Sequence, residues 1–239
     1  MSIRKNLLPK SLPEPLDTLR AAVFPDRCNL CGNVVAHGVT VCDQCKESAK
    51  VIRAPRCISC GKAKKNCKCK GRSNFYNGIT APFDYEGVVR KGISLWKFQK
   101  AERNVYFFAD MIVSAVNEAF EGIEFDLITF IPQTETERKS RTYNQCEQLA
   151  SAIGEKTGIP VIRTLTKLYE TERQHNLPLI SRSGNVFGIF DCCNKNLIAD
   201  KNILLIDDIK TSGNTINECA KMLHLNGAAS VYCAVIAIA

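Results

Sequence analysis

Long hydrophobic runs are missing from this sequence of 239 residues. The longest unbroken apolar stretch runs from Val231 to Ala239, far short of the ~20 residues that a membrane-spanning helix needs. Prolines and charged residues also interrupt the N-terminal 25 residues, which therefore lack the apolar core of a signal peptide. The sequence thus predicts no transmembrane segment, no export and a cytoplasmic location.

Large apolar side chains are also scarce between residues 28 and 70, so this segment cannot build a core of ordinary size. Charge is distributed unevenly along the chain. Residues 1–75 contain 15 Lys and Arg against 5 Asp and Glu, a balance of +10, whereas the remainder has 17 against 19, a balance of −2. Eight of the 13 Cys lie in the same basic part. The chain is therefore expected to have a small, basic, Cys-rich part followed by a larger, near-neutral one.

The eight N-terminal cysteines follow metal-ligand spacing. A protein that is not exported is not expected to use its cysteines as a disulfide framework. The spacings are C-x2-C-x10-C-x2-C and C-x2-C-x6-C-x1-C, from Cys28, Cys31, Cys42, Cys45, Cys57, Cys60, Cys67 and Cys69. Two such sets can each hold one structural zinc ion, whose binding supplies the folding energy that the missing core cannot. Free or redox-active thiols are the alternative, and crossed pairing between the two sets stays open.

Two further expectations concern residues near and beyond these cysteines. Gly32 and Gly61 follow the first CxxC pair of each set, where a zinc turn often needs a positive φ. The other five cysteines fall in predicted helices or strands of the second domain and are expected to be small buried core residues. They are Cys146, Cys192, Cys193, Cys219 and Cys233.

Strand and helix patterns alternate after residue 73, which indicates an α/β domain with a parallel sheet and flanking helices. A short amphipathic helix is predicted earlier, over residues 14–24. The later helices are predicted over residues 109–120, 144–156 and 215–226. Strands are predicted over residues 126–131, 159–163 and 202–206 and in the terminal apolar run, and residues 168–185 are predicted to be mostly loop. The predicted division is an arm with a short helix over 1–24, a double zinc ribbon over 25–72 and a phosphate-binding domain over 73–239.

The motif with the clearest chemistry spans Ile203 to Thr215. A buried strand is expected to end at Asp207 and Asp208, whose carboxylates can accept hydrogen bonds from a pair of sugar hydroxyls. The following Thr-Ser-Gly turn opens a helix, so backbone N–H groups from Thr211 to Thr215 can surround a phosphate. GxxxxGK[ST] and GxGxxG are both absent, which excludes the corresponding nucleotide-binding loops.

This motif resembles the PRPP-binding motif of type I phosphoribosyltransferases, and the chain as a whole resembles the ComF (ComFC-like) competence family. The wider resemblance lies in Phe24-Pro25, Tyr85-Glu86-Gly87, Lys97-Phe98, Arg141-Thr-Tyr-Asn-Gln145, Arg173-Gln174, Arg182-Ser-Gly-Asn-Val186 and the terminal apolar strand. The family usually has Arg-Gly-Phe-Asn-Gln where this chain has Arg141 to Gln145. The resemblance implies a double zinc ribbon joined to a phosphoribosyltransferase-like domain. It implies PRPP binding by Asp207, Asp208, Lys210, Thr211, Ser212, Gly213, Asn214 and Thr215.

Catalytic roles follow from the same resemblance. Asp207 and Asp208 would orient the ribose and help to hold Mg²⁺ with PRPP, while Arg138 and Arg141 would bind the pyrophosphate leaving group. A solvated basic loop is the alternative for these two arginines. Arg173 and Arg182 fall in the long predicted loop, which in phosphoribosyltransferases closes over the reacting centre.

The function implied is that of an accessory protein of natural transformation, the uptake of external DNA, alongside a competence helicase or translocase. The basic N-terminal part is compatible with binding single-stranded DNA. The alternative is an active phosphoribosyltransferase acting on an unidentified acceptor in nucleotide salvage or metabolism. No acceptor pocket can be identified from the sequence.

Overall fold

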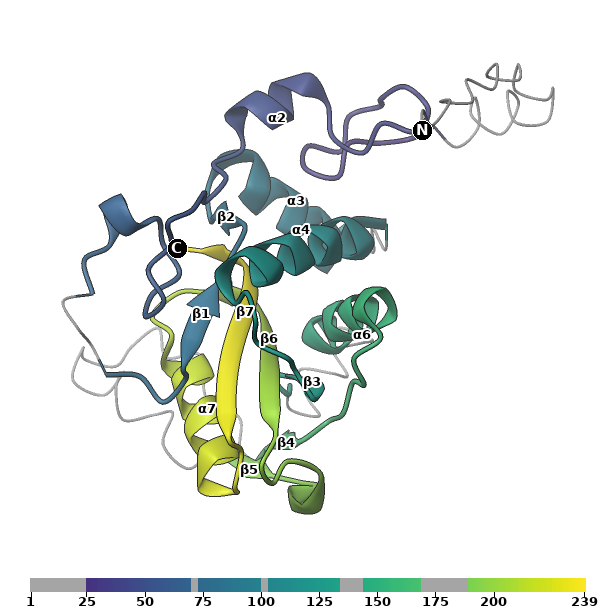
Figure 1. Ribbon diagram of the computed structural model, residues 1–239. Helices are drawn as coiled ribbons and strands as arrows, with labels where there is room; N and C mark the ends of the chain where they lie inside the picture. Colours follow the sequence, from purple (N-terminus) through teal and green to yellow (C-terminus); the bar gives the residue numbers. More distant parts are fainter. Residues whose placement is uncertain (1–24, 70–72, 100–102, 134–143, 169–188) are drawn as a thin grey trace, which may run out of the picture.

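The computed structural model describes residues 25–69, 73–99, 103–133, 144–168 and 189–239 (Figure 1). The predicted arm and helix over residues 1–24 lie outside this range, as do Arg138, Arg141, Arg173 and Arg182. The Cys-rich segment contains a short helix, α2 (Asp43–Ser48), and a 3-10 turn, η1 (Lys64–Asn66). Turns and isolated bridges make up most of the rest of this segment.

A five-stranded parallel sheet forms the centre of the second part. Strand β7 (Ser230–Ile238) pairs on one side with β1 (Gly78–Thr80) and then β2 (Phe83–Asp84), and on the other side with β6 (Asn202–Lys210). Strand β3 (Leu127–Phe130) pairs with the far side of β6. Most side chains of β6 and β7 are buried, as expected for parallel strands covered on both faces.

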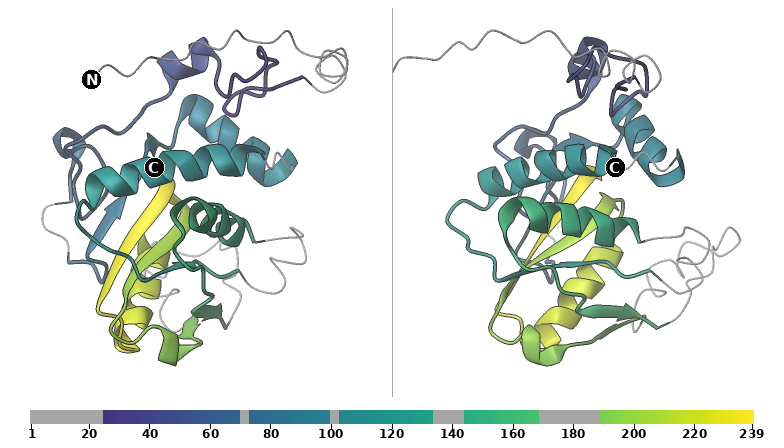
Figure 2. Two further views of the ribbon diagram at one scale, coloured as in Figure 1. Left: turned by 45° about the vertical axis from the view of Figure 1, so that its right-hand side comes forward. Right: turned by 90° about the vertical axis from the view of Figure 1, so that its right-hand side faces the viewer.

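Helices cover both faces of this sheet (Figure 2). α4 (Arg103–Ala119) and α6 (Gln145–Thr157) lie on one face, and α7 (Asn214–Leu225) lies on the other. We call the segment with Cys28 to Cys45 the first ribbon and the segment with Cys57 to Cys69 the second ribbon. Helix α3 (Gly87–Gln99) lies between the first ribbon and α4, near the carboxyl ends of the strands. A small antiparallel pair, β4 (Leu165–Lys167) and β5 (Phe190–Cys192), precedes the 3-10 turn η3 (Lys195–Leu197). The predicted α/β class with a parallel sheet is confirmed.

Several predicted boundaries need correction. β6 continues past Ile206 to Lys210 because β7 still pairs with it there, for example Asp207 with Val235. The strand predicted over 159–163 is reduced to a single bridge between Val161 and Ile128, at a position where Pro160 has no N–H to donate. α4 begins six residues before the predicted 109, at Arg103. β4 and β5 were not predicted, and residues 169–188 of the predicted loop lie outside the described residues.

Candidate functional site

The eight N-terminal cysteines form two separate clusters. In each cluster the four Sγ atoms lie within 4.8 Å of one another, Cys28, Cys31, Cys42 and Cys45 in the first and Cys57, Cys60, Cys67 and Cys69 in the second. Four thiolates ~2.3 Å from one zinc ion would be roughly 3.8 Å apart. The observed Sγ pairs include Cys31–Cys42 at 3.8 Å and Cys60–Cys67 at 3.7 Å. The clusters therefore fit two structural zinc ions, and the crossed pairing that the sequence left open does not occur.

The two CxxC turns repeat the same backbone pattern. The N–H of Cys28 donates to Asn33 and that of Cys57 to Lys62, both at 2.8 Å. Gly32 and Gly61 have φ angles of 80° and 79°, which confirms the expected left-handed conformation. Backbone N–H groups favour the ionised form of one sulfur in each cluster, whereas the pKa of Cys45 and of Cys60 is raised, mainly by burial. Burial opposes the thiolate of Cys28, but backbone N–H donors lower its pKa to about 6, and a backbone N–H from Cys69 lowers the pKa of Cys67 to about 6.

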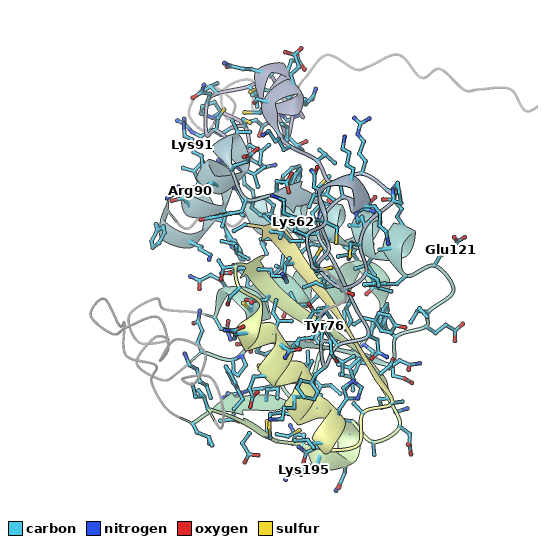
Figure 3. The ribbon with its side chains drawn as sticks, turned by 90° about the vertical axis from the view of Figure 1, so that its left-hand side faces the viewer. Lys62, Tyr76, Arg90, Lys91, Glu121 and Lys195 are labelled. Atoms are coloured by element: carbon cyan, nitrogen blue, oxygen red, sulfur yellow. The ribbon has the colours of Figure 1, made fainter. Side chains whose placement is uncertain are left out.

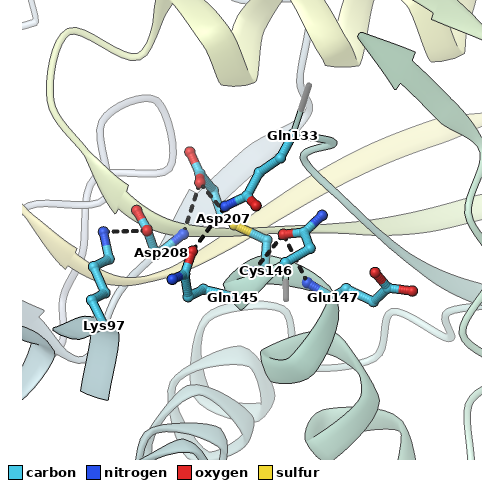
Figure 4. A network of polar contacts seen from close by, with 8 residues as sticks. Lys97, Gln133, Gln145, Cys146, Glu147, Asp207 and Asp208 are labelled. Atoms are coloured by element: carbon cyan, nitrogen blue, oxygen red, sulfur yellow. Dashed lines mark hydrogen bonds and ion pairs between the residues drawn. The ribbon is translucent and has the colours of Figure 1, made fainter. Parts of the chain in front are cut away.

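The two adjacent acids of the phosphate motif lie inside β6, near its carboxyl end (Figure 4). Oδ1 of Asp207 accepts hydrogen bonds from the backbone N–H of Asp208 at 2.8 Å and from the thiol of Cys146 at 3.4 Å. The carboxylate of Asp208 forms an ion pair with Lys97 from α3. Burial and the nearby charge of Asp208 together raise the pKa of Asp207 to about 7. The site therefore holds two adjacent carboxylates beside one lysine, and the pKa of Asp207 is raised.

The turn that follows β6 has the backbone of an anion site. Gly213 is the N-cap of α7 with φ 83°, and α7 has no side-chain cap. This positive φ is a conformation that L side chains rarely adopt, so the turn favours glycine at this position. Thr211, Ser212 and Asn214 are exposed. The predicted helix thus begins within a few residues of the acid pair, and the N–H groups of its first turn have no side-chain cap.

Polar residues at the start of α6 complete the surroundings of Asp207. Asn144 caps α6 by accepting from the N–H groups of Cys146 and Glu147, at 3.0 and 3.4 Å. The next residue, Gln145, is buried and accepts from Nε2 of Gln133 at 2.8 Å. Within the described residues, Oε1 of Gln133 and Nε2 of Gln145 have no partner. Two buried amide groups beside the acids therefore keep unused hydrogen-bonding capacity.

Sequence reasoning did not assign a role to Lys97, Gln133, Gln145 or Cys146. Lys97 and Gln145 occur in the motifs that carried the family resemblance, but nothing local indicated that they meet the acid pair. Of the five expected core thiols, Cys146, Cys192, Cys219 and Cys233 are buried and Cys193 is half-buried. Cys146 differs from a plain core residue because its thiol contacts Asp207.

A basic groove lies between the two ribbons. Its volume is about 680 Å³. The lining includes the basic residues Lys46, Lys50, Arg53, Lys64 and Lys65, with Glu47 and Asp84 as the acidic ones. Lys46 pairs with Asp43 at 2.8 Å. Lys50 likewise pairs with Glu86 at 2.5 Å. Part of the positive charge of the N-terminal part therefore lines a concave surface.

Comparison with known proteins bears on both parts of the chain. A double zinc ribbon domain matches residues 19–75, and a phosphoribosyl transferase domain matches residues 147–238. The DNA utilization protein YhgH of Salmonella typhimurium is 24% identical over 208 residues, which cover 85% of this chain and 86% of that protein. Competence protein ComFC of Bacillus subtilis is 24% identical over 225 residues, covering 85% and 90%. The chain is therefore similar over most of its length to proteins of competence and DNA utilization.

The two matched domains agree with the structure, in which two clusters of four cysteines precede a parallel α/β sheet. The clusters and the zinc ribbon match together support structural zinc. Adenine phosphoribosyltransferase from Thermoanaerobacter pseudethanolicus is 16% identical with a TM-score of 0.37, over 59% of this chain and 82% of that one. A likeness this distant carries no functional argument. Among the described helices, none is long and apolar enough to cross a membrane.

Proposed function

We propose that this protein is a ComF-type accessory protein of DNA uptake whose phosphoribosyltransferase-like domain binds PRPP. The names of its relatives, competence protein and DNA utilization protein, support the first part of this proposal. The observation that supports the second part most directly is the arrangement at the carboxyl end of β6. There two carboxylates are followed within a few residues by the uncapped start of a helix.

The proposed ligand contacts follow from the chemistry of the two halves of this arrangement. Asp207 and Asp208 would accept hydrogen bonds from the ribose 2′- and 3′-hydroxyls. The N–H groups and hydroxyls of Thr211, Ser212, Gly213, Asn214 and Thr215 would surround the 5′-phosphate, with Lys210 beside them. Arg138 and Arg141, outside the described residues, would bind the pyrophosphate group.

Magnesium fits the same two carboxylates. Mg²⁺ prefers oxygen ligands and is usually held by one or two carboxylates together with substrate phosphates. Asp207 and Asp208 offer such oxygens, whereas the nearby sulfur of Cys146 is a poor ligand for this hard cation. When bound, Mg²⁺ would neutralise part of the charge of the pyrophosphate group. The pKa of about 7 for Asp207 means that this carboxyl is ionised in only part of the molecules at neutral pH.

For the DNA-uptake role, the basic groove between the ribbons is the proposed contact with single-stranded DNA. Five Lys and Arg side chains line it against two acidic ones. A concave basic surface can follow a phosphodiester backbone without recognising its sequence. The helicase or translocase expected from the family resemblance remains a proposed partner.

Calorimetric titration of the zinc-loaded protein with PRPP in the presence of Mg²⁺ tests ligand binding. The wild type should bind, and Asp208→Asn should weaken binding at least tenfold because it removes a carboxylate that accepts from the ribose. Asp200→Asn is a matched control, since Asp200 is exposed and lies before β6. Equal affinities for all three proteins, or no binding by the wild type at millimolar PRPP, would refute PRPP binding at this site.

Release of pyrophosphate separates binding from catalysis. An active phosphoribosyltransferase should release pyrophosphate from Mg–PRPP when a suitable acceptor is present, and Asp208→Asn should abolish the release. A purely binding role predicts no release above the variant's level across a broad panel of nitrogenous bases and amines. Release by the wild type with one of these acceptors would make the alternative function, nucleotide salvage or metabolism, the better one.

A further inference from the structure

Lys97 connects the N-terminal half of the chain to the acid pair. It comes from the last turn of α3, and its ammonium group forms an ion pair with Asp208 (Figure 4). The exposed fractions of these two side chains are 14% and 19%, so water screens the pair less than it screens a surface pair. Arg90 and Lys91 lie on the same helix but are exposed (Figure 3).

The first zinc turn holds the helix that carries Lys97. A Cβ on Gly92 would lie 2.8 Å from the carbonyl oxygen of Asn29 and 3.0 Å from Cα of Leu30. The backbone of α3 therefore lies directly against the turn between Cys28 and Cys31. A side chain on Gly32 would likewise lie 3.2 Å from Leu95. On α3, these contacts fall five and two residues before Lys97.

A single buried amide joins the same elements. Nδ2 of Asn104, on α4, donates to the carbonyl of Asn29 at 2.8 Å and to that of Gly92 at 3.2 Å. Asn104 is fully buried. Its amide therefore links the zinc turn, α3 and α4 at one point. A shift of the turn cannot leave α3 in place without breaking one of these buried hydrogen bonds, which is costly.

The second ribbon packs against a different element. A Cβ on Gly61 would lie 2.5 Å from the side chain of Ile238 and 3.3 Å from the carbonyl of Ile79. The N–H of Ile79 also donates to Ile58 at 2.9 Å. This ribbon is thus seated on β1 and the end of β7, whereas the first is seated on α3. The two zinc ribbons therefore contact the second domain through different elements.

We propose that Lys97 is a positioning residue for the acid pair, and that the first zinc ribbon sets its position through α3. The ammonium group holds the Asp208 carboxylate in one orientation and offsets the repulsion between two adjacent carboxylates. The integrity of the first CxxC turn then governs the affinity of the site for Mg–PRPP. This inference rests on the PRPP binding proposed above and adds its dependence on the first ribbon.

A double-mutant cycle on the full-length, zinc-loaded protein tests whether the first ribbon acts on the acid pair through Lys97. Lys97→Met should weaken Mg–PRPP binding at least tenfold, while the control Lys91→Met should stay within twofold of the wild type. Gly92→Ala displaces the turn from α3 without altering a zinc ligand or a residue of the site, and should weaken binding at least fivefold with zinc content unchanged. In the Lys97→Met background, Gly92→Ala should weaken Mg–PRPP binding less than twofold, because α3 no longer carries a lysine that contacts Asp208.

The second ribbon provides the comparison within the same cycle. Gly61→Ala disturbs the packing of the second ribbon on the sheet. Its effect on Mg–PRPP affinity should be the same in the wild-type and Lys97→Met backgrounds. Leu95→Ala replaces Gly92→Ala if the latter does not fold. Full additivity of the first-ribbon variant with Lys97→Met, or unchanged or tighter binding by Lys97→Met, would overturn the inference.

The reactivity of the Lys97 amine gives a readout that needs no PRPP. Acylation of Lys97, followed by peptide mass spectrometry, should be slow in the wild type, where Asp208 holds the ammonium group, and at least threefold faster in both Asp208→Asn and Gly92→Ala. If the wild type binds no PRPP, the proposed function fails, but this readout still decides the link between ribbon and lysine. Equal rates in the wild type and Gly92→Ala would refute that link.

Discussion

The thiol of Cys146 lies 3.4 Å from Oδ1 of Asp207, although 61 residues separate them in the sequence. Burial and the charge of Asp207 raise the pKa of Cys146 well above its usual range. The sulfur is therefore protonated and acts as a weak donor to the carboxylate. This contact places one acid of the pair against the start of α6, away from water, while the other acid faces the lysine of α3. The two carboxylates consequently have different surroundings.

The environment of Asp207 makes stability depend on pH. Its folded-state pKa of about 7 lies above its unfolded value of 3.8, so the folded protein binds this proton more tightly. The stability that the bound proton contributes is fully present below about pH 4 and is lost as the pH rises through about 7. Asp207→Asn stays neutral. Between pH 5 and pH 8.5, the unfolding free energy of the wild type should therefore fall by more than about 1 kcal/mol relative to that of Asp207→Asn.

Urea unfolding in magnesium-free buffer at the two pH values measures this difference. Asp200→Asn, on an exposed acid, should follow the wild type at both. A constant difference between Asp207→Asn and the wild type would show that Asp207 titrates normally.

Zinc content tests the two cysteine clusters. Metal analysis of protein purified with reductant and without chelator should find about two zinc ions per chain, because each closed set of four thiolates satisfies one tetrahedral ion. Cys31→Ser and Cys60→Ser should each lower the content to about one. Stripping the metal should lower the unfolding temperature, since metal binding supplies folding energy to a segment with little core. A chain without zinc would contradict this account of both ribbons.

Helix α6 packs closely against residues 159–161 at Gly154. A Cβ on Gly154 would lie 2.4 Å from Cγ2 of Val161 and 3.1 Å from the carbonyl of Ile159. Gly154→Ala should therefore overpack the boundary between α6 and residues 159–161 and cost about 1–3 kcal/mol of unfolding free energy. The neighbouring Glu155 is exposed, and Glu155→Ala should stay within about 0.5 kcal/mol of the wild type. Equal stability of the two variants in urea unfolding would show that this boundary is looser than described.

Salt dependence tests contact between the basic groove and DNA. Affinity for single-stranded DNA should fall steeply as salt rises, and each lost phosphate contact should reduce the slope of log K against log salt by about 0.7. Replacing Lys64 and Lys65, which line the groove, by Gln should reduce the slope by up to about twice that amount. Lys195→Gln is the control, because Lys195 does not line the groove and lies at the bottom end of the molecule in Figure 3, well apart from Lys62. A slope that both variants leave unchanged would place DNA elsewhere.

The features that sequence predicted well are those set by local chemistry. The spacing of the cysteines indicated both clusters, and Gly32 and Gly61 adopt the expected φ. The acid pair and the helix start after it lie together because they are neighbours in the chain. The end of β6 was placed too early because Asp207 and Asp208 look like the end of a strand. Pairing with β7, a tertiary contact, extends it.

The rest of the site depends on contacts between distant segments. Lys97 and Asp208 are 111 residues apart, and only the packing of α3 against the zinc turn and α4 brings them together. Gln133 and Gln145 meet because β3 and α6 converge, which no local pattern reveals. The strand predicted over 159–163 failed for a related reason, since its apolar residues pack on α6 and make only one bridge to β3.

A structure of the protein with Mg²⁺ and PRPP tests the central claim most directly. We expect the 5′-phosphate at the N–H groups of residues 211–215 and the ribose hydroxyls on Asp207 and Asp208. Asp207 and Asp208 would also help to hold Mg²⁺, which would offset part of the charge of the pyrophosphate group. PRPP bound away from the end of β6, or absent from this site at millimolar concentration, would contradict the account.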